Sequence, residues 1–116
     1  MKKILIKRVY DTPSKSDGYR VLIDRIWPRG VSKKEAKLDA WNKELAPSTQ
    51  LRKWFDHDPN KFDAFTVKYK TELEDRTDAL KQLRQTLKKQ TVTLLYGTKD
   101  NEHNQALVLK KVLEDV

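Results

Sequence analysis

Two residue types are scarce in this sequence: it has no cysteine and only three glycines. Without cysteine there is no disulfide framework, thiolate nucleophile, Cys-ligated zinc or iron–sulfur cluster. Three glycines leave no Walker loop, dinucleotide fingerprint or Gly-x-Ser-x-Gly elbow, which disfavours nucleoside-triphosphate hydrolysis and dinucleotide redox chemistry. The lack of cysteine also fits a reducing cytosol, so we expect a cytoplasmic protein.

Long apolar runs are missing as well. Nothing approaches the roughly 18 consecutive apolar residues of a membrane span, and the apolar start of the chain soon meets Lys7 and Arg8, which leaves no room for a signal-peptide core. The Asp56-His57-Asp58 run has metal-ligand side chains, but two histidines in the whole chain argue against a metal cage. We therefore expect no membrane association, no metal and no cofactor.

Basic residues are abundant, with 25 Lys and Arg against 17 Asp and Glu, a net charge of +8 and a pI near 9.7. Residues 1–58 hold 14 basic and 8 acidic residues, so most of the excess lies in the first half. Such a basic protein favours anionic partners, namely nucleotides, phosphorylated small molecules or nucleic acid. The length of 116 residues allows one domain, which we place at 1–116.

Short apolar runs rich in β-branched residues predict buried strands at 3–9, 19–26 and 91–96. Helix signals fall between and after them. They predict a short helix from a Ser32–Glu35 capping box, two short helices within 38–55, a helix begun by Asp58-Pro59 with Phe62, Phe65, Tyr69 and Leu73 on its buried face, a helix over 77–89 and a terminal helix over 103–114.

Continuous apolar strands are typical of sheets covered on both faces, which are mostly parallel. The sequence therefore predicts a single-domain α/β fold with a small, mostly parallel sheet of three strands, or slightly more, flanked by helices. The connection between the first two strands is about the shortest that can carry a parallel crossover, so an antiparallel first pair is the alternative.

Polar residues gather where the predicted strands end, and ligands of open parallel sheets bind at those ends. Arginine and lysine there suit phosphate or carboxylate, while carboxylates and histidine suit proton transfer. The candidate ligand-binding residues are Arg8, Tyr10, Arg25, Arg29, Tyr96 and Lys99, and the candidate catalytic residues are Asp24, Asp100 and His103. Structural roles compete with these: ion pairs for Asp24 and Arg25, helix capping for Asp100, and a wall position for Tyr96.

Several blocks of the sequence resemble a known family. They are Lys7-Arg8-Val9-Tyr10, the run Asp17 to Lys33 that contains Trp27-Pro28-Arg29-Gly30, Leu45-Ala46-Pro47-Ser48, Arg52-Lys53-Trp54-Phe55, His57-Asp58-Pro59, and Leu94-Leu95-Tyr96 with Lys99-Asp100 and Glu102-His103-Asn104. Over nearly its whole length the chain resembles the YeaO-like family, small bacterial proteins within a larger group of unknown function. Wider members of that group carry a Cys-His-Arg element after the last strand, where this chain has Glu102-His103-Asn104-Gln105. The resemblance therefore implies no cysteine chemistry here.

The leading hypothesis is a pocket at the carboxyl ends of the strands that binds a small anionic or nucleotide-like ligand, with or without acid/base catalysis. The alternative is a non-catalytic nucleic-acid-binding module, in which the basic first half contacts phosphates. A protein–protein adaptor is a third reading that the sequence neither supports nor excludes.

Overall fold

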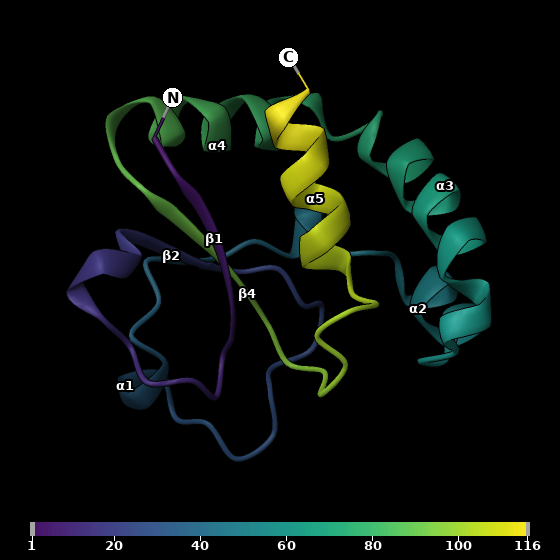
Figure 1. Ribbon diagram of the computed structural model, residues 1–116, viewed down its shortest axis with the longest axis horizontal. Coiled ribbons are helices and arrows are strands. Elements are labelled where there is room, and N and C mark those ends of the chain that lie inside the picture. The colour runs from purple at the N-terminus through teal and green to yellow at the C-terminus, as the bar shows by residue number, and fades with distance from the viewer. Residues whose placement is uncertain (1, 116) are drawn as a thin grey trace.

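The computed structural model describes residues 2–115 and contains a four-stranded sheet whose strands are all parallel, in the order β1–β4–β2–β3 (Figure 1). The strands are β1 Ile4–Arg8, β2 Tyr19–Leu22, β3 Ala40–Trp41 and β4 Val92–Tyr96. The predicted α/β class and the parallel arrangement are confirmed, and the sheet gains β3 as a two-residue edge strand. Because β4 lies between β1 and β2, the first two strands are not neighbours.

Strand β2 ends four residues earlier than the apolar pattern predicts. Its ladder with β4 runs from Tyr19 to Leu22, and one more backbone bond joins the Ile23 N–H to the Leu95 carbonyl oxygen at 3.0 Å. The chain then leaves the sheet, and the Ile26 side chain is 55% exposed. The predicted end near Ile26 is wrong because that apolar residue belongs to a surface loop.

The helical elements are mostly those expected. They are the 3₁₀ turns η1 Lys15–Asp17, η2 Lys43–Leu45 and η3 Pro59–Lys61, and the α-helices α1 Lys33–Ala36, α2 Thr49–Phe55, α3 Phe62–Leu73, α4 Thr77–Lys89 and α5 Gln105–Glu114. The Ser32–Glu35 capping box forms as predicted. The Asp58 side chain caps η3, which leads directly into α3.

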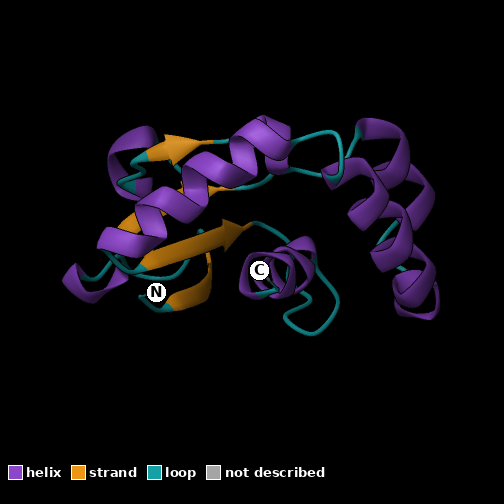
Figure 2. Ribbon diagram, turned by 90° about the horizontal axis from the view of Figure 1, so that it is seen from above, coloured by secondary structure: helices purple, strands orange, loops and turns teal. Residues whose placement is uncertain are grey.

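The larger core lies on one face of the sheet, beneath α2 to α5. Side chains that alternate along the strands point into it, among them Ile4, Val21 and Leu94. The predicted face of α3 is confirmed: Phe65 and Tyr69 are buried and Phe62 packs beside them. Figures 1 and 2 show α5 between the sheet and α3, while α4 crosses the end at which the strands begin.

The opposite face of the sheet has a much smaller apolar cluster. Leu22 and Leu95 point into it, and it is covered by Trp27 from the loop after β2, Ala36 of α1 and Trp41 of β3. The two indole rings meet edge to face with their centroids 5.2 Å apart. Helices therefore layer chiefly on one face, whereas the sequence predicts them on both.

A buried carboxylate holds the short connection from β1 to β2 in place. Asp17 in η1 lies over β4, where its carbonyl oxygen accepts from Thr93 Oγ1 at 2.7 Å. Its carboxylate accepts from Lys7 of β1 at 3.1 Å and from Arg20 of β2 at 2.5 Å. Side chains from three strands thus converge on one residue, and the crossing needs no helix longer than one 3₁₀ turn.

Candidate functional site

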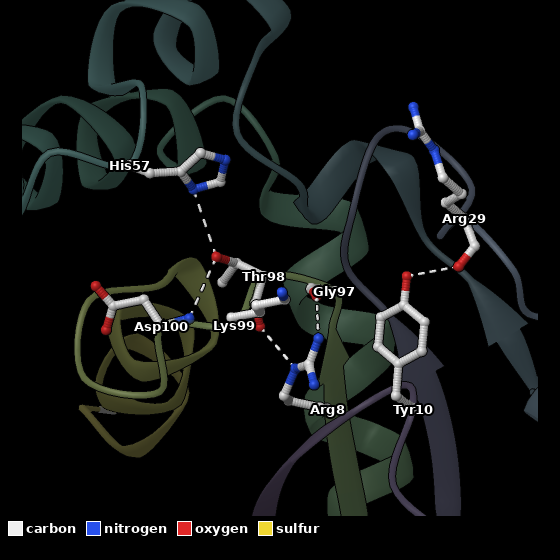
Figure 3. Close-up of a pocket in the computed structure, with 8 residues that line it drawn as sticks. All are labelled: Arg8, Tyr10, Arg29, His57, Gly97, Thr98, Lys99 and Asp100. Atoms are coloured by element: carbon white, nitrogen blue, oxygen red, sulfur yellow. Dashed lines mark hydrogen bonds between the residues drawn. The ribbon is translucent and has the colours of Figure 1, made fainter.

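The loops after β1, β2 and β4 converge with the start of α5 at the carboxyl end of the sheet, where two adjoining cavities open. Figure 3 shows the residues that line the outer of the two. The outer cavity has a volume of about 780 Å³ and the inner cavity about 420 Å³. Both volumes lie in the range of small-molecule sites. The residues that line both are Tyr10, Arg29, His57, Gly97 and Thr98, so the two cavities form one continuous cleft.

Arg8 forms the base of the outer cavity. Its Nε donates to the Thr98 carbonyl oxygen at 2.8 Å and its Nη2 to the Gly97 carbonyl oxygen at 3.0 Å, which fixes the guanidinium against the loop after β4 (Figure 3). The Tyr10 ring lies 4.6 Å from this guanidinium, and the Tyr10 hydroxyl donates to the Arg29 carbonyl oxygen at 2.7 Å. These contacts connect three loops and use two of the five N–H donors of Arg8.

Asp24 lines the inner cavity. Its Oδ1 accepts from Gln105 Nε2, and a Cβ at Gly97 would lie 2.8 Å from its Oδ2, so only glycine leaves room for this carboxylate. Burial raises the pKa of Asp24 to about 6, although the Gly97 backbone N–H and the Gln105 amide favour the charged form. The positive charge of Arg52 on α2 acts in the same direction as those two donors. Asp24 therefore changes its charge in the range where carboxyls act as proton donors and acceptors.

Arg25 has a structural role at the wall of the inner cavity. Its Nε donates to the Pro47 carbonyl oxygen at 3.0 Å and its Nη2 to the Ala46 carbonyl oxygen at 3.3 Å. The side chain thereby ties the loop after β2 to the segment before α2. The other N–H donors of Arg25 make no hydrogen bond within residues 2–115.

Asp100 and His103 form a pair just before α5. The Asp100 carboxylate accepts from the Glu102 and His103 backbone N–H groups at 2.9 and 3.0 Å, and its Oδ2 lies 3.0 Å from His103 Nδ1. The pKa of Asp100 is lowered, chiefly by the hydrogen bond from the Glu102 backbone. Burial acts in the opposite direction, and the hydrogen bonds from His103 lower the pKa further. The helix cap itself is Asn104, whose side chain accepts from the Leu107 N–H. Asp100 thus orders the turn that precedes the helix.

His57 is a site residue that sequence reasoning missed. It and Asp56 both adopt left-handed backbone conformations, with φ of 56° and 47°. This turn at the end of α2 carries the imidazole over both cavities, where Nδ1 lies 3.4 Å from Thr98 Oγ1 (Figure 3). Two consecutive left-handed residues other than glycine are unusual, but nothing in the sequence foretells them.

The structure brings most of the predicted site residues together, in two groups. Arg8, Lys99 and Asp100 line the outer cavity, Asp24, Arg25 and His103 line the inner one, and Tyr10 and Arg29 line both. Tyr96 lines neither cavity, because it is 3% exposed and packs in the larger core. Burial raises the pKa of its hydroxyl.

The cleft holds more positive than negative charge, with five cationic side chains against the carboxylates of Asp24 and Asp100. Five cationic side chains line it, namely Arg8, Arg25, Arg29, Arg52 and Lys99. Within residues 2–115 the ion pairs are those of Lys7, Arg20 and His103, so none of the five is paired with a carboxylate. An anionic group can therefore approach these side chains without displacing a carboxylate from an ion pair.

Residues 2–115 contain neither a group of metal ligands nor a helix that could span a membrane. Among the described residues no three His, Asp or Glu side chains are grouped closely enough to hold a metal ion. Over the same part of the chain no helix has the length and apolar character needed to cross a bilayer.

The chain is similar to proteins of several bacteria. A family model described as "Inactive DUF488-N3 subclade" matches residues 3–116. The "Uncharacterized protein YeaO" of Escherichia coli strain K12 is 47% identical over 106 residues, covering 91% of this chain and 92% of the relative. The "Uncharacterized protein Rv3073c" of Mycobacterium tuberculosis strain H37Rv is 39% identical over 111 residues, covering 96% and 93%. No solved structure matches. This chain belongs to the YeaO-like family, in the subclade that the family model describes.

Proposed function

We propose that this protein binds a small anionic, nucleotide-like ligand in the cleft at the carboxyl ends of the strands. The observation that carries the proposal is the group of five cationic side chains that line the cleft and have no carboxylate partner among residues 2–115. Arginine offers planar pairs of N–H donors that match phosphate and carboxylate oxygens. We place the protein in the cytoplasm, because phosphorylated small molecules are made there and do not cross membranes unaided.

Binding without turnover is the form of the proposal that we favour. The family model describes an inactive subclade, and the chain has no cysteine, whereas wider members of the resembled group carry a Cys-His-Arg element after the last strand. Asp100 and His103 also have a structural task at the turn before α5.

Acid/base catalysis is the second candidate, and one contact favours it. A carboxylate that holds His103 Nδ1 leaves the opposite ring nitrogen free to exchange a proton with a ligand in the inner cavity, where Asp24 also lies. Prolonged incubation of the protein with nucleoside monophosphates, followed by phosphorus NMR, separates the two. An unchanged spectrum fits binding alone, and product signals that vanish in His103→Asn establish catalysis.

Calorimetric titration tests the binding itself. Ribose 5-phosphate, nucleoside monophosphates and single- and double-stranded oligonucleotides are titrated at two salt concentrations. We expect the small phosphates to bind with a shallow salt dependence and Lys99→Ala to weaken them about three- to tenfold, as loss of one charge-assisted contact predicts. Arg76→Ala removes an exposed charge outside the cleft and serves as the control.

Two results would overturn the proposal. Equal loss of binding in Lys99→Ala and Arg76→Ala would mean that net charge rather than the cleft attracts the phosphate. Oligonucleotide binding with a steep salt dependence and no binding of small phosphates would establish the nucleic-acid-binding module instead, because each phosphate contact releases counterions.

A further inference from the structure

Asp24 presents a carboxylate to the inner cavity with part of its hydrogen-bonding capacity unfilled. Its Oδ1 accepts from Gln105 Nε2, and Gly97 lies against its Oδ2 with its backbone N–H favouring the charged form. A carboxylate has about four lone-pair positions, so each oxygen keeps one more. The Asp24 backbone is held as well, since its carbonyl oxygen accepts from Trp41 Nε1 at 2.6 Å. Each carboxylate oxygen of Asp24, which lines the inner cavity, thus has capacity for one more donor.

A carboxylate with one acceptor position left on each oxygen can pair with a ligand that has two adjacent N–H donors. A ring N–H beside an exocyclic amino group, as on the Watson–Crick edge of guanine, has this arrangement, whereas adenine places an acceptor beside its amino group. Hypoxanthine keeps the ring N–H but lacks the amino group. The carboxylate of Asp24 thus discriminates among purines by the number of donors that each one offers.

The cavity around Asp24 suits a flat ring. Its lining includes apolar surface from Phe55, Trp27 and Pro28, and its volume is about 420 Å³. It adjoins the outer cavity, which Lys99 lines. Gln105 adds one further acceptor: its Nε2 is used by Asp24 and by the Ile23 carbonyl oxygen, and its Oε1 makes no hydrogen bond within the described chain. A base in the inner cavity and its phosphate in the outer one can therefore be bound at once.

We propose that the ligand is a purine nucleotide of the guanine type, whose base donates its ring N–H and amino group to Asp24 in the inner cavity while its phosphate lies among the cations of the cleft. This rests on the proposed function and names the substrate class of the same site. The desolvated carboxylate supports it, because donors on a ligand replace the water that Asp24 has lost.

Calorimetry with GMP, IMP, AMP and ribose 5-phosphate tests the assignment. We expect GMP to bind about ten- to a hundredfold more tightly than ribose 5-phosphate, with IMP between them and AMP close to the sugar phosphate. In Asp24→Asn the amide replaces one acceptor with a donor, so the preference for GMP over ribose 5-phosphate should be lost. Asp75→Asn, an exposed carboxyl in the turn after α3, is the matched control and should behave as the wild type.

The outcomes separate this inference from the proposed function. If ribose 5-phosphate binds and GMP binds no better, or if the GMP preference survives in Asp24→Asn, the base assignment is wrong while the anion site stands. If none of the four compounds binds, both fail. Gly97→Ala gives an independent check, because its Cβ forces the Asp24 carboxylate to move and should also abolish the preference. Thermal unfolding of each variant verifies that it is folded.

Discussion

Replacing Asp24 by asparagine should stabilise the protein above neutral pH and leave its stability almost unchanged in acid. Burial raises the pKa of this carboxyl from 3.8 to about 6, so ionisation costs more in the folded chain than in the unfolded one. Each pH unit of difference corresponds to ~1.36 kcal/mol, which gives a cost of about 3 kcal/mol as an upper bound. The side chain keeps some contact with water, and we therefore expect a gain of about 1–3 kcal/mol.

The sign follows from the two pKa values. Below 3.8 the carboxyl is protonated in both states and resembles the amide, so the variant and the wild type should unfold alike. As the pH rises from 3.8 through about 6, the folded wild type loses stability that the variant keeps. Above that range the difference should be constant.

Urea unfolding followed by circular dichroism, at pH values from 4 to 8, measures this difference. Asp75→Asn should give a flat difference over the same range. His57 and His103 also line the inner cavity, so the comparison is repeated in His57→Asn and His103→Asn backgrounds. A difference independent of pH, or one that favours the wild type above pH 7, would refute the reasoning.

Three further predictions concern stability and binding. Phe65→Ala removes a buried ring stacked 4.4 Å from that of Phe55 and should cost about 3–5 kcal/mol in chemical denaturation, whereas a loss under about 1 kcal/mol would mean that this face is not core. Arg25→Lys breaks the contacts with the Ala46 and Pro47 carbonyls and should lower the free energy of unfolding by about 1–2 kcal/mol. Arg29→Lys should leave stability unchanged and weaken phosphate binding. Identical effects of the two substitutions would contradict their separate roles. Gly18→Ala should lower the free energy of unfolding by more than about 3 kcal/mol, because φ is +65° and the Cβ would lie 2.2 Å from the Thr91 carbonyl oxygen. The Cβ of Gly30→Ala meets open space, so an equal loss of stability in the two variants would contradict this.

Local signals predicted the helices well because helices are stabilised by residues close in sequence. The three-and-four spacing from Phe62 to Leu73 and the capping residues Ser32 and Asp58 identified α1 and α3 correctly. The edge strand β3 was missed because two residues carry no periodicity. Its pairing depends on β2 lying beside it, which is a tertiary fact.

The site was predicted from topology rather than from a motif. Parallel strands bring their carboxyl ends together, and this alone placed Arg8, Asp24 and Lys99 around one cleft. Tyr96 was placed in the site by the same argument, but its side chain packs in the core. It lies two residues after the buried Leu94 in β4, and side chains two residues apart on a strand point to the same face of the sheet. Neither His57 nor Gln105 could be found in this way, since each comes from a helix end whose distance to the sheet is set by packing.

The unequal cores on the two faces of the sheet have a consequence for how the molecule fluctuates. The helical face holds most of the buried apolar side chains, whereas the loop after β2 rests on a small cluster around Leu22 and Leu95. Local opening is least costly where few apolar contacts are broken, so residues 24–39 should exchange their amide hydrogens before β1, β4 or α5 do. The same loop carries Asp24 and Arg29 and forms one wall of the inner cavity. Transient release of this wall would admit a molecule to the interior of the cleft while the rest of the fold stays closed.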